Sequence, residues 1–152
     1  MKDTLCYNVL GDIMGKYSLV VEDTLKKLKK IIDVVDLDDK KIKATGYNGT
    51  PSGVESCYER GTCYRIENNI PSGTCYETCR SIHAEQNAII QAGQDRCKGS
   101  TMYIYGHNFI CILCKRFIVQ SGIVKVYLKK DDESEIVEVS VDDIKKELDN
   151  QR

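Results

Sequence analysis

The stretch SIHAEQNAIIQAGQDRCKGSTMYIYGHNFICILC, residues 81–114, decides the fold and also carries the most informative side chains. Its first apolar residues recur at helical spacing, which predicts a helix over 82–92 with Ser81 as N-cap. The segment TMYIYG (101–106) predicts a strand. A second helix is expected over 111–120, ended by Gly122. The stretch therefore has the helix–strand–helix pattern of an α/β fold.

The same periodicities predict the remaining elements on either side of this stretch. They are a helix around Leu5–Met14, a second helical piece within 18–30, a β-hairpin of 31–37 and 41–48, strands IVKVYL (123–128) and EIVEVSV (135–141), and a tail helix 142–149 capped by Ser140 or Asp142. Strand–helix–strand alternation after a hairpin predicts a three-layer α/β/α sandwich around a mixed β-sheet.

The chain is expected to form one domain over residues 1–152. Within it, residues 46–80 are rich in Gly, Ser, Asn and Cys and hold both prolines, which predicts a cysteine-rich loop insert. So long a loop is uncommon in a compact domain unless it has a function. Residues 129–152 are expected to add a C-terminal strand and helix.

Two short motifs inside 81–114 have the composition of a metal site. His83 and Glu85 lie two residues apart, and Cys111 and Cys114 lie at i and i+3 on one face of the expected second helix. One imidazole and two thiolates form a three-ligand zinc set with a fourth position left for water, as in catalytic zinc sites. Glu85 has the chemistry to move the protons of that water.

Each motif alone has an ordinary explanation. A C-x-x-C pair could be redox-active or half of a structural zinc knot, and a buried histidine is usually just packed. The two motifs together, with a glutamate that no structural site requires, favour a catalytic zinc with Glu85 as its proton shuttle.

Composition excludes several classes of protein. The net charge is −1, so no basic excess indicates a large nucleic-acid footprint. No apolar run is long enough to span a membrane. Eight cysteines in a chain that shows no export signal favour metal ligation and free thiols over disulfides, so we expect a cytoplasmic protein.

With these motifs in view, the chain resembles the cytidine/deoxycytidylate deaminase superfamily. HAEQNAI and CILC carry that resemblance, and GYNGTPSG (46–53), NNIPSG (68–73) and CRSIHAEQNAIIQA (79–92) resemble the deoxycytidylate (dCMP) deaminase branch. The resemblance implies hydrolytic deamination of dCMP to dUMP in pyrimidine deoxynucleotide metabolism, by a homo-oligomer that could also bind an allosteric nucleotide.

Carried over residue by residue, the resemblance implies zinc ligation by His83, Cys111 and Cys114 and proton transfer by Glu85. Asn48 falls on the family's Y-N-G asparagine, which contacts the nucleotide sugar. Thr45, three residues earlier, is a second candidate for substrate binding.

The chain also departs from the family pattern. Ile110 stands where the family usually has a proline before the first cysteine, and the N-terminal third lacks the family's S-x-C-x-R…V-G-A segment. Two alternatives therefore stay open. The chain could deaminate another nucleobase or nucleotide, or it could be a non-catalytic, zinc-stabilised nucleotide-binding module.

A second metal site is a hypothesis for the loop insert. Cys57, Cys63, Cys75 and Cys79 all fall between residues 46 and 80, and a closed four-thiolate zinc site would order a long loop that has no core of its own. The alternative is four free thiols. Arg80 is a candidate partner for a substrate phosphate, or equally a surface charge.

Overall fold

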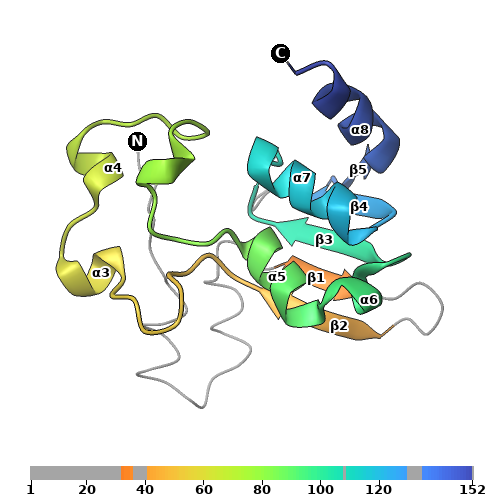
Figure 1. Cartoon of the computed structure of the whole chain (residues 1–152), viewed down its shortest axis with the longest axis horizontal. Coiled ribbons are helices and arrows are strands. Elements are labelled where there is room, and N and C mark those ends of the chain that lie inside the picture. The colour runs from red at the N-terminus through yellow and green to blue at the C-terminus, as the bar shows by residue number, and fades with distance from the viewer. Residues whose placement is uncertain (1–31, 36–40, 108, 130–134, 152) are drawn as a thin grey trace. The chain divides into compact units, whose positions relative to one another are not determined.

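The computed structural model describes residues 32–35, 41–107, 109–129 and 135–151 (Figure 1). The two helices expected before residue 31 lie outside these residues. The described chain divides into two compact units: one holds the described residues of 32–47 and 84–151, and the other holds residues 48–83. The boundary at 83/84 falls on the peptide bond that joins His83 to the first residue of a helix.

The first unit is built on a five-stranded mixed sheet in the order β2-β1-β3-β4-β5. The strands are β1 (Ile32–Val35), β2 (Ile42–Gly46), β3 (Thr101–Tyr105), β4 (Lys125–Lys129) and β5 (Val137–Ser140). β3 and β4 are parallel and the other three pairs are antiparallel. A parallel pair needs a crossover connection, which the second predicted helix supplies.

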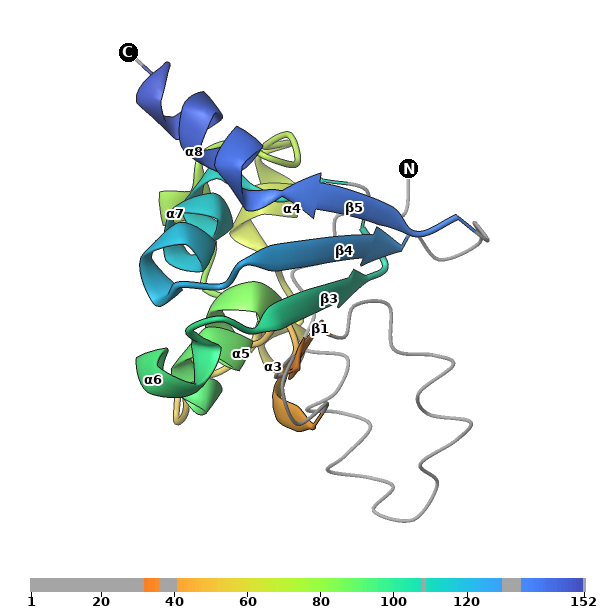
Figure 2. The same cartoon turned by 90° about the vertical axis from the view of Figure 1, so that its right-hand side faces the viewer.

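The described helices of this unit lie along one face of the sheet (Figures 1 and 2). They are α5 (Ala84–Ala92), α6 (Gln94–Cys97), α7 (Ile112–Ser121) and α8 (Val141–Asp149). The core between helices and sheet is apolar because alternate strand residues face it; Met102, Ile104 and Val126 are at most 2% exposed. The mixed sheet and its helical layer confirm the predicted α/β class.

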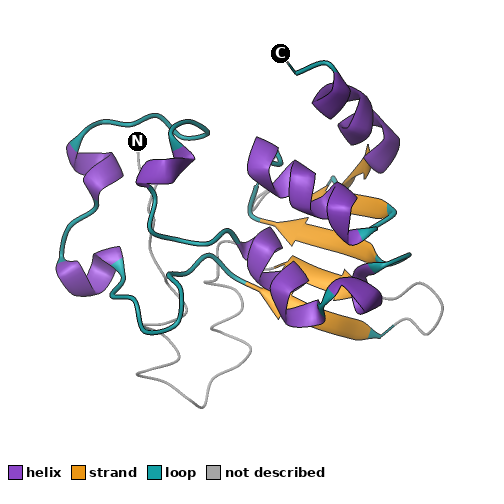
Figure 3. Cartoon of the chain, in the orientation of Figure 1, coloured by secondary structure: helices purple, strands orange, loops and turns teal. Residues whose placement is uncertain are grey.

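The second unit contains three short helical turns inside the segment predicted as loop (Figure 3). They are α3 (Cys57–Arg60), α4 (Tyr64–Glu67) and the 3₁₀ turn η1 (Tyr76–Thr78). α3 is fixed by a capping box, in which Ser56 and Glu59 satisfy each other's backbone N–H groups, and Gly61 ends it with φ 69°. Among the described residues, no helix is both long and apolar enough to cross a membrane.

Most predicted elements are confirmed within two residues, and one boundary is wrong in a way that matters. α5 begins at Ala84, so His83 directly precedes the helix instead of lying in its first turn, and Ser81 is not its N-cap. The Ser81 hydroxyl is buried with no hydrogen-bond partner in the described structure. At the tail, Ser140 is the cap of α8, with its side chain accepting from the Asp143 N–H.

Candidate metal centre

The start of α7 presents two thiols together. Cys111 is the N-cap, and its Sγ accepts the N–H of Cys114 at 3.4 Å. Both side chains are buried, Cys114 completely. An N–H donor and the positive end of a helix both favour the thiolate over the thiol, which is the form that binds metal. Gly122 ends α7 in the left-handed region, φ 79°, as predicted.

His83 is held at the end of the extended segment that leads into α5. The preceding residue, Ile82, exchanges two backbone hydrogen bonds with Gly49, at 3.1 and 2.8 Å. The His83 ring packs edge-on against Tyr76, with ring centroids 5.3 Å apart. These contacts restrict both the backbone and the ring of His83.

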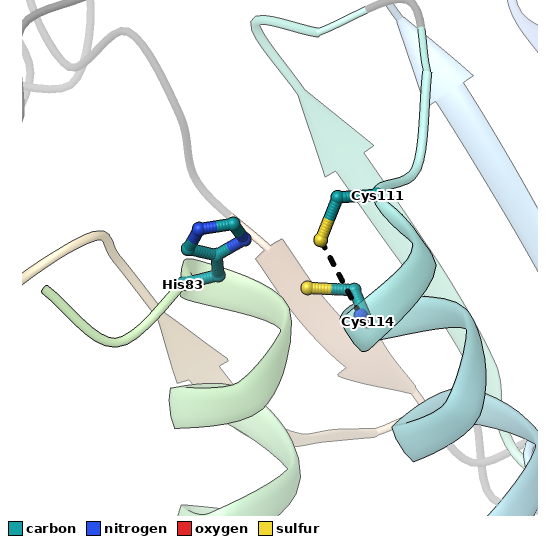
Figure 4. A group of neighbouring side chains, drawn as sticks. All are labelled: His83, Cys111 and Cys114. Carbon is teal, nitrogen blue, oxygen red and sulfur yellow. Dashed lines mark hydrogen bonds between the residues drawn. The ribbon is translucent and has the colours of Figure 1, made fainter. Parts of the chain in front are cut away.

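The three predicted ligands converge. One ligand atom each from His83, Cys111 and Cys114 lies within 4.8 Å of the other two, and no other such group of three exists among the described residues. Figure 4 shows the imidazole and both thiols pointing toward one another. Tetrahedral zinc, with Zn–S near ~2.3 Å and Zn–N near ~2.0 Å, requires this kind of convergence. One imidazole and two thiols suit zinc.

Glu85 lies in the first turn of α5 and is 1% exposed. Burying a carboxylate carries a desolvation cost that proteins accept when the group is paired or used in chemistry. Its place two residues after His83 makes it the acid–base candidate of the site.

The structure treats the two substrate-binding candidates differently. Asn48 is half-buried and directly precedes Gly49, and His83 directly follows Ile82. Because the Gly49–Ile82 bridge is antiparallel, Asn48 and His83 both come next to it in the same direction, one on each segment. Thr45 lies on β2, where Ala44 and Gly46 are buried and Thr45 is exposed. Since Gly46 faces α5, strand alternation directs the Thr45 side chain to the opposite face of β2.

Three of the four loop cysteines lie near one another. Cys57 and Cys63 are buried, and burial, together with the neighbouring Cys63 and Cys79 thiols, raises the pKa of the Cys57 thiol to about 11. Arg80 acts in the opposite direction on that pKa. Cys75 is exposed, with a positive φ of 46°, and is not among the groups that act on Cys57.

Sequence reasoning missed the residue that organises this unit. Arg65 is 5% exposed, and its guanidinium donates to the carbonyls of Cys75 and Pro71 at 2.6 and 2.8 Å and to the Thr78 hydroxyl at 3.1 Å. A guanidinium presents N–H donors on separate nitrogens in a fixed planar fork, a geometry that the lysine ammonium lacks. No sequence motif marks Arg65, because its partners lie in a separate turn.

Comparisons with known proteins agree with this geometry. Residues 22–130 match the family model described as the cytidine and deoxycytidylate deaminase zinc-binding region. A deoxycytidylate deaminase of Schizosaccharomyces pombe is 36% identical over 99 residues, covering 65% of this chain and 30% of that protein. One from Mycobacterium phage D29 is 30% identical over 105 residues, covering 66% of this chain and 78% of the phage protein.

Among solved structures, a dCMP deaminase from the cyanophage S-TIM5 in complex with dCMP and dUMP is similar, with 21% sequence identity and a TM-score of 0.48. That match covers 82% of this chain and 83% of the phage chain. The chain spans less than a third of the length of the fission-yeast relative.

Proposed function

The chain belongs to the family of the cytidine and deoxycytidylate deaminase zinc-binding region, and on that premise we propose that it hydrolyses dCMP to dUMP and ammonia. The observation that carries the proposal is the convergence of His83, Cys111 and Cys114 beside a helix whose first turn holds the buried Glu85. Relatives named deoxycytidylate deaminase at 30–36% identity support dCMP as the substrate.

The proposed chemistry divides between the metal and one carboxylate. His83, Cys111 and Cys114 would hold zinc, whose Lewis acidity would lower the pKa of a water molecule toward neutrality. Glu85 accepts a proton from that water and delivers it to ring N3, which makes C4 electrophilic. After the hydroxyl group adds to C4, Glu85 moves the proton of that hydroxyl group to the amino group, the C4=O bond forms as the C4–N bond breaks, and ammonia leaves.

Asn48 is the proposed contact to the nucleotide sugar. The supporting observation is that Asn48 and His83 are the chain neighbours of Gly49 and Ile82, which the backbone bridge joins. Thr45 is the second candidate from the sequence. Its side chain lies on the face of β2 away from α5 and its N–H donates to the Gln91 Oε1, so we do not propose Thr45 as a contact to the nucleotide.

The test is ammonia release from purified protein with dCMP, run beside cytidine, dCTP and guanine, with zinc quantified in the same sample. Turnover of dCMP with at least one zinc per chain is the expected result. Preference for another substrate would select the alternative of a different deaminase, and zinc without any turnover would select the non-catalytic nucleotide-binding module.

Glu85→Gln is the matched variant, because it keeps the shape of the side chain and removes the proton acceptor. It should retain zinc and lose about 10²–10⁴-fold in kcat. Activity at the wild-type level in this variant would refute Glu85 as the proton shuttle.

For the cysteine-rich unit we propose a second, structural zinc on Cys57, Cys63 and Cys79, whose thiols would have to move together, because their ligand atoms do not form a three-ligand group in the described structure. Cys63 and Cys79 are close enough to act on the Cys57 thiol, and the nearby Arg80 guanidinium, whose Nη1 is buried with no hydrogen-bond partner in the described chain, would offset the charge of clustered thiolates. Cys75, predicted as the fourth ligand, is exposed. Two zinc ions per chain would support this site, and one would contradict it.

The remaining proposals concern assembly and location. A homo-oligomer is supported by apolar surface on two helices: Ile90 of α5 is 63% exposed and Phe117 of α7 is 43% exposed. Phe117 also lines a cavity of about 430 Å³ with Ile89 and Arg116. Metal-binding and free thiols require a reducing compartment, which supports a cytoplasmic location. Light scattering of the purified protein tests the oligomer.

A further inference from the structure

Two side-chain amides on α5 hold the edge strand β2. The Asn87 Nδ2 donates to the Tyr47 carbonyl at 2.8 Å, and the Thr45 N–H donates to the Gln91 Oε1 at 3.2 Å. Asn87 and Gln91 are one helical turn apart and share a helix face. β2 ends the sheet order, so these backbone groups lie along the edge that no described strand covers.

In each of the two hydrogen bonds, the backbone group determines which partner donates and which accepts. A backbone N–H can only donate and a carbonyl can only accept. Gln91 must therefore present its oxygen to Thr45, and Asn87 must present its nitrogen to Tyr47. The two amides look equivalent in the sequence, but one acts as an acceptor and the other as a donor.

The donor bond acts on the residue beside a proposed substrate contact. Tyr47 directly precedes Asn48, and Gly49, which follows it, is held by two hydrogen bonds to Ile82. Both chain neighbours of Asn48 are thus attached to the segment that carries His83 and Glu85. One residue before Tyr47, β2 approaches α5 so closely that a Cβ on Gly46 would clash with the Ala84 carbonyl oxygen.

From this arrangement we infer that Asn87 is a positioning residue: its amide N–H holds the Tyr47 carbonyl and thereby fixes Asn48 for the nucleotide. The inference rests on the proposed function, in which Asn48 contacts the sugar. It requires no direct contact between Asn87 and the substrate.

The opposite polarities supply a matched pair of variants. Asn87→Asp removes the donor and places a carboxylate oxygen against the Tyr47 carbonyl, whereas Gln91→Glu keeps an oxygen that accepts from Thr45. Both changes are nearly isosteric, add one negative charge, and lie four residues apart on α5. At pH 7.5 we expect kcat/KM for dCMP to fall about tenfold in Asn87→Asp, mainly through KM, and less than about twofold in Gln91→Glu.

The pH dependence separates a lost donor from general loosening. A protonated aspartic acid regains an O–H donor, so the ratio of wild-type to Asn87→Asp kcat/KM should shrink as the pH is lowered from 7.5 to 5. Gln91→Glu should show no such recovery. Equal losses in the two variants, or a pH-independent loss in Asn87→Asp, would overturn the inference.

A double-mutant cycle tests whether Asn87 acts through Asn48. In an Asn48→Ala background, Asn87→Asp should cost less than about twofold further in kcat/KM, because the residue it positions is gone. An undiminished tenfold loss in that background would assign Asn87 a role that is independent of Asn48.

Failure of the proposed function can be told apart from failure of this inference. If the wild type does not turn over dCMP, the function is refuted, and amide hydrogen exchange of the 45–49 segment then decides the inference without any activity. Exchange at Asn48 should be at least about fivefold faster in Asn87→Asp than in Gln91→Glu. Equal exchange in the two variants would refute the positioning role.

Discussion

The chain gathers cysteines in two places, and the two groups are built in different ways. Cys111 and Cys114 lie at the start of the ten-residue helix α7, one turn apart, with a backbone N–H already donated to sulfur. Cys57, Cys63 and Cys79 lie on three separate short turns of the other unit, at the start of α3, the N-cap of α4 and the C-cap of η1. Thiols spaced by a regular helix can be recognised from the sequence, whereas thiols gathered by irregular chain cannot.

The largest effect should come from the helical group. Cys114→Ser removes a ligand atom that lies within 4.8 Å of both other ligands, so we expect loss of the catalytic zinc and of detectable turnover. Metal analysis and ammonia release measure the two losses. Cys75→Ser is the control, since Cys75 is exposed, and it should keep both zinc and activity. A Cys114→Ser protein that still binds zinc and is still active would contradict the assignment of Cys114 as a required zinc ligand.

Substitutions among the cysteines of the 48–83 unit should change the local stability of that unit more than they change turnover. Replacing Cys57 and Cys63 together by serine should remove one zinc per chain and leave most of the turnover, because neither thiol belongs to the His83 group. Limited proteolysis should then cleave the 48–83 unit at least about tenfold faster than in the wild type. Unchanged zinc content in the double variant would mean that these thiols are free.

Gly46 lies in a closely packed position of one unit and Gly53 in an open position of the other, so alanine should lower the free energy of unfolding by different amounts at the two positions. Gly46→Ala places a Cβ 2.5 Å from the Ala88 backbone nitrogen, so the free energy of unfolding should fall by about 1–3 kcal/mol or more. Gly53, in the other unit, has open space around its missing Cβ and a φ of +79°, so Gly53→Ala should cost only backbone strain, about 1–2 kcal/mol. Denaturant unfolding measures both, and a smaller loss for Gly46→Ala would contradict the packing argument.

Arg65 gives the most local effect. Arg65→Lys keeps the charge but replaces the two nitrogens that separately bond the Cys75 and Pro71 carbonyls by one, so we expect a loss of about 0.5–1.5 kcal/mol confined to the cysteine-rich unit. Hydrogen exchange should rise in residues 71–79 and stay constant in α7. Equal increases in both segments would show that Arg65 supports the whole chain.

Much of the fold could be predicted because regular elements leave a period in the sequence. The hairpin, strands β3 and β4 and helix α7 were all predicted within two residues of their observed ends. The start of α5 was misplaced, because Ser81 has the composition of an N-cap while the Gly49–Ile82 bridge keeps that segment extended. A local preference was overruled by pairing with residues more than thirty positions away.

The sequence by itself determined the family, and it supplied the candidate metal ligands and the proposed acid–base residue, since His83, Glu85, Cys111 and Cys114 stand in two short motifs with the spacing of a zinc site. Only the tertiary structure decided which loop thiols meet and which face of β2 Thr45 occupies. It alone assigned donor and acceptor roles to Asn87 and Gln91. Those outcomes depend on contacts between segments far apart in the chain, and such contacts leave no periodic signal in the sequence.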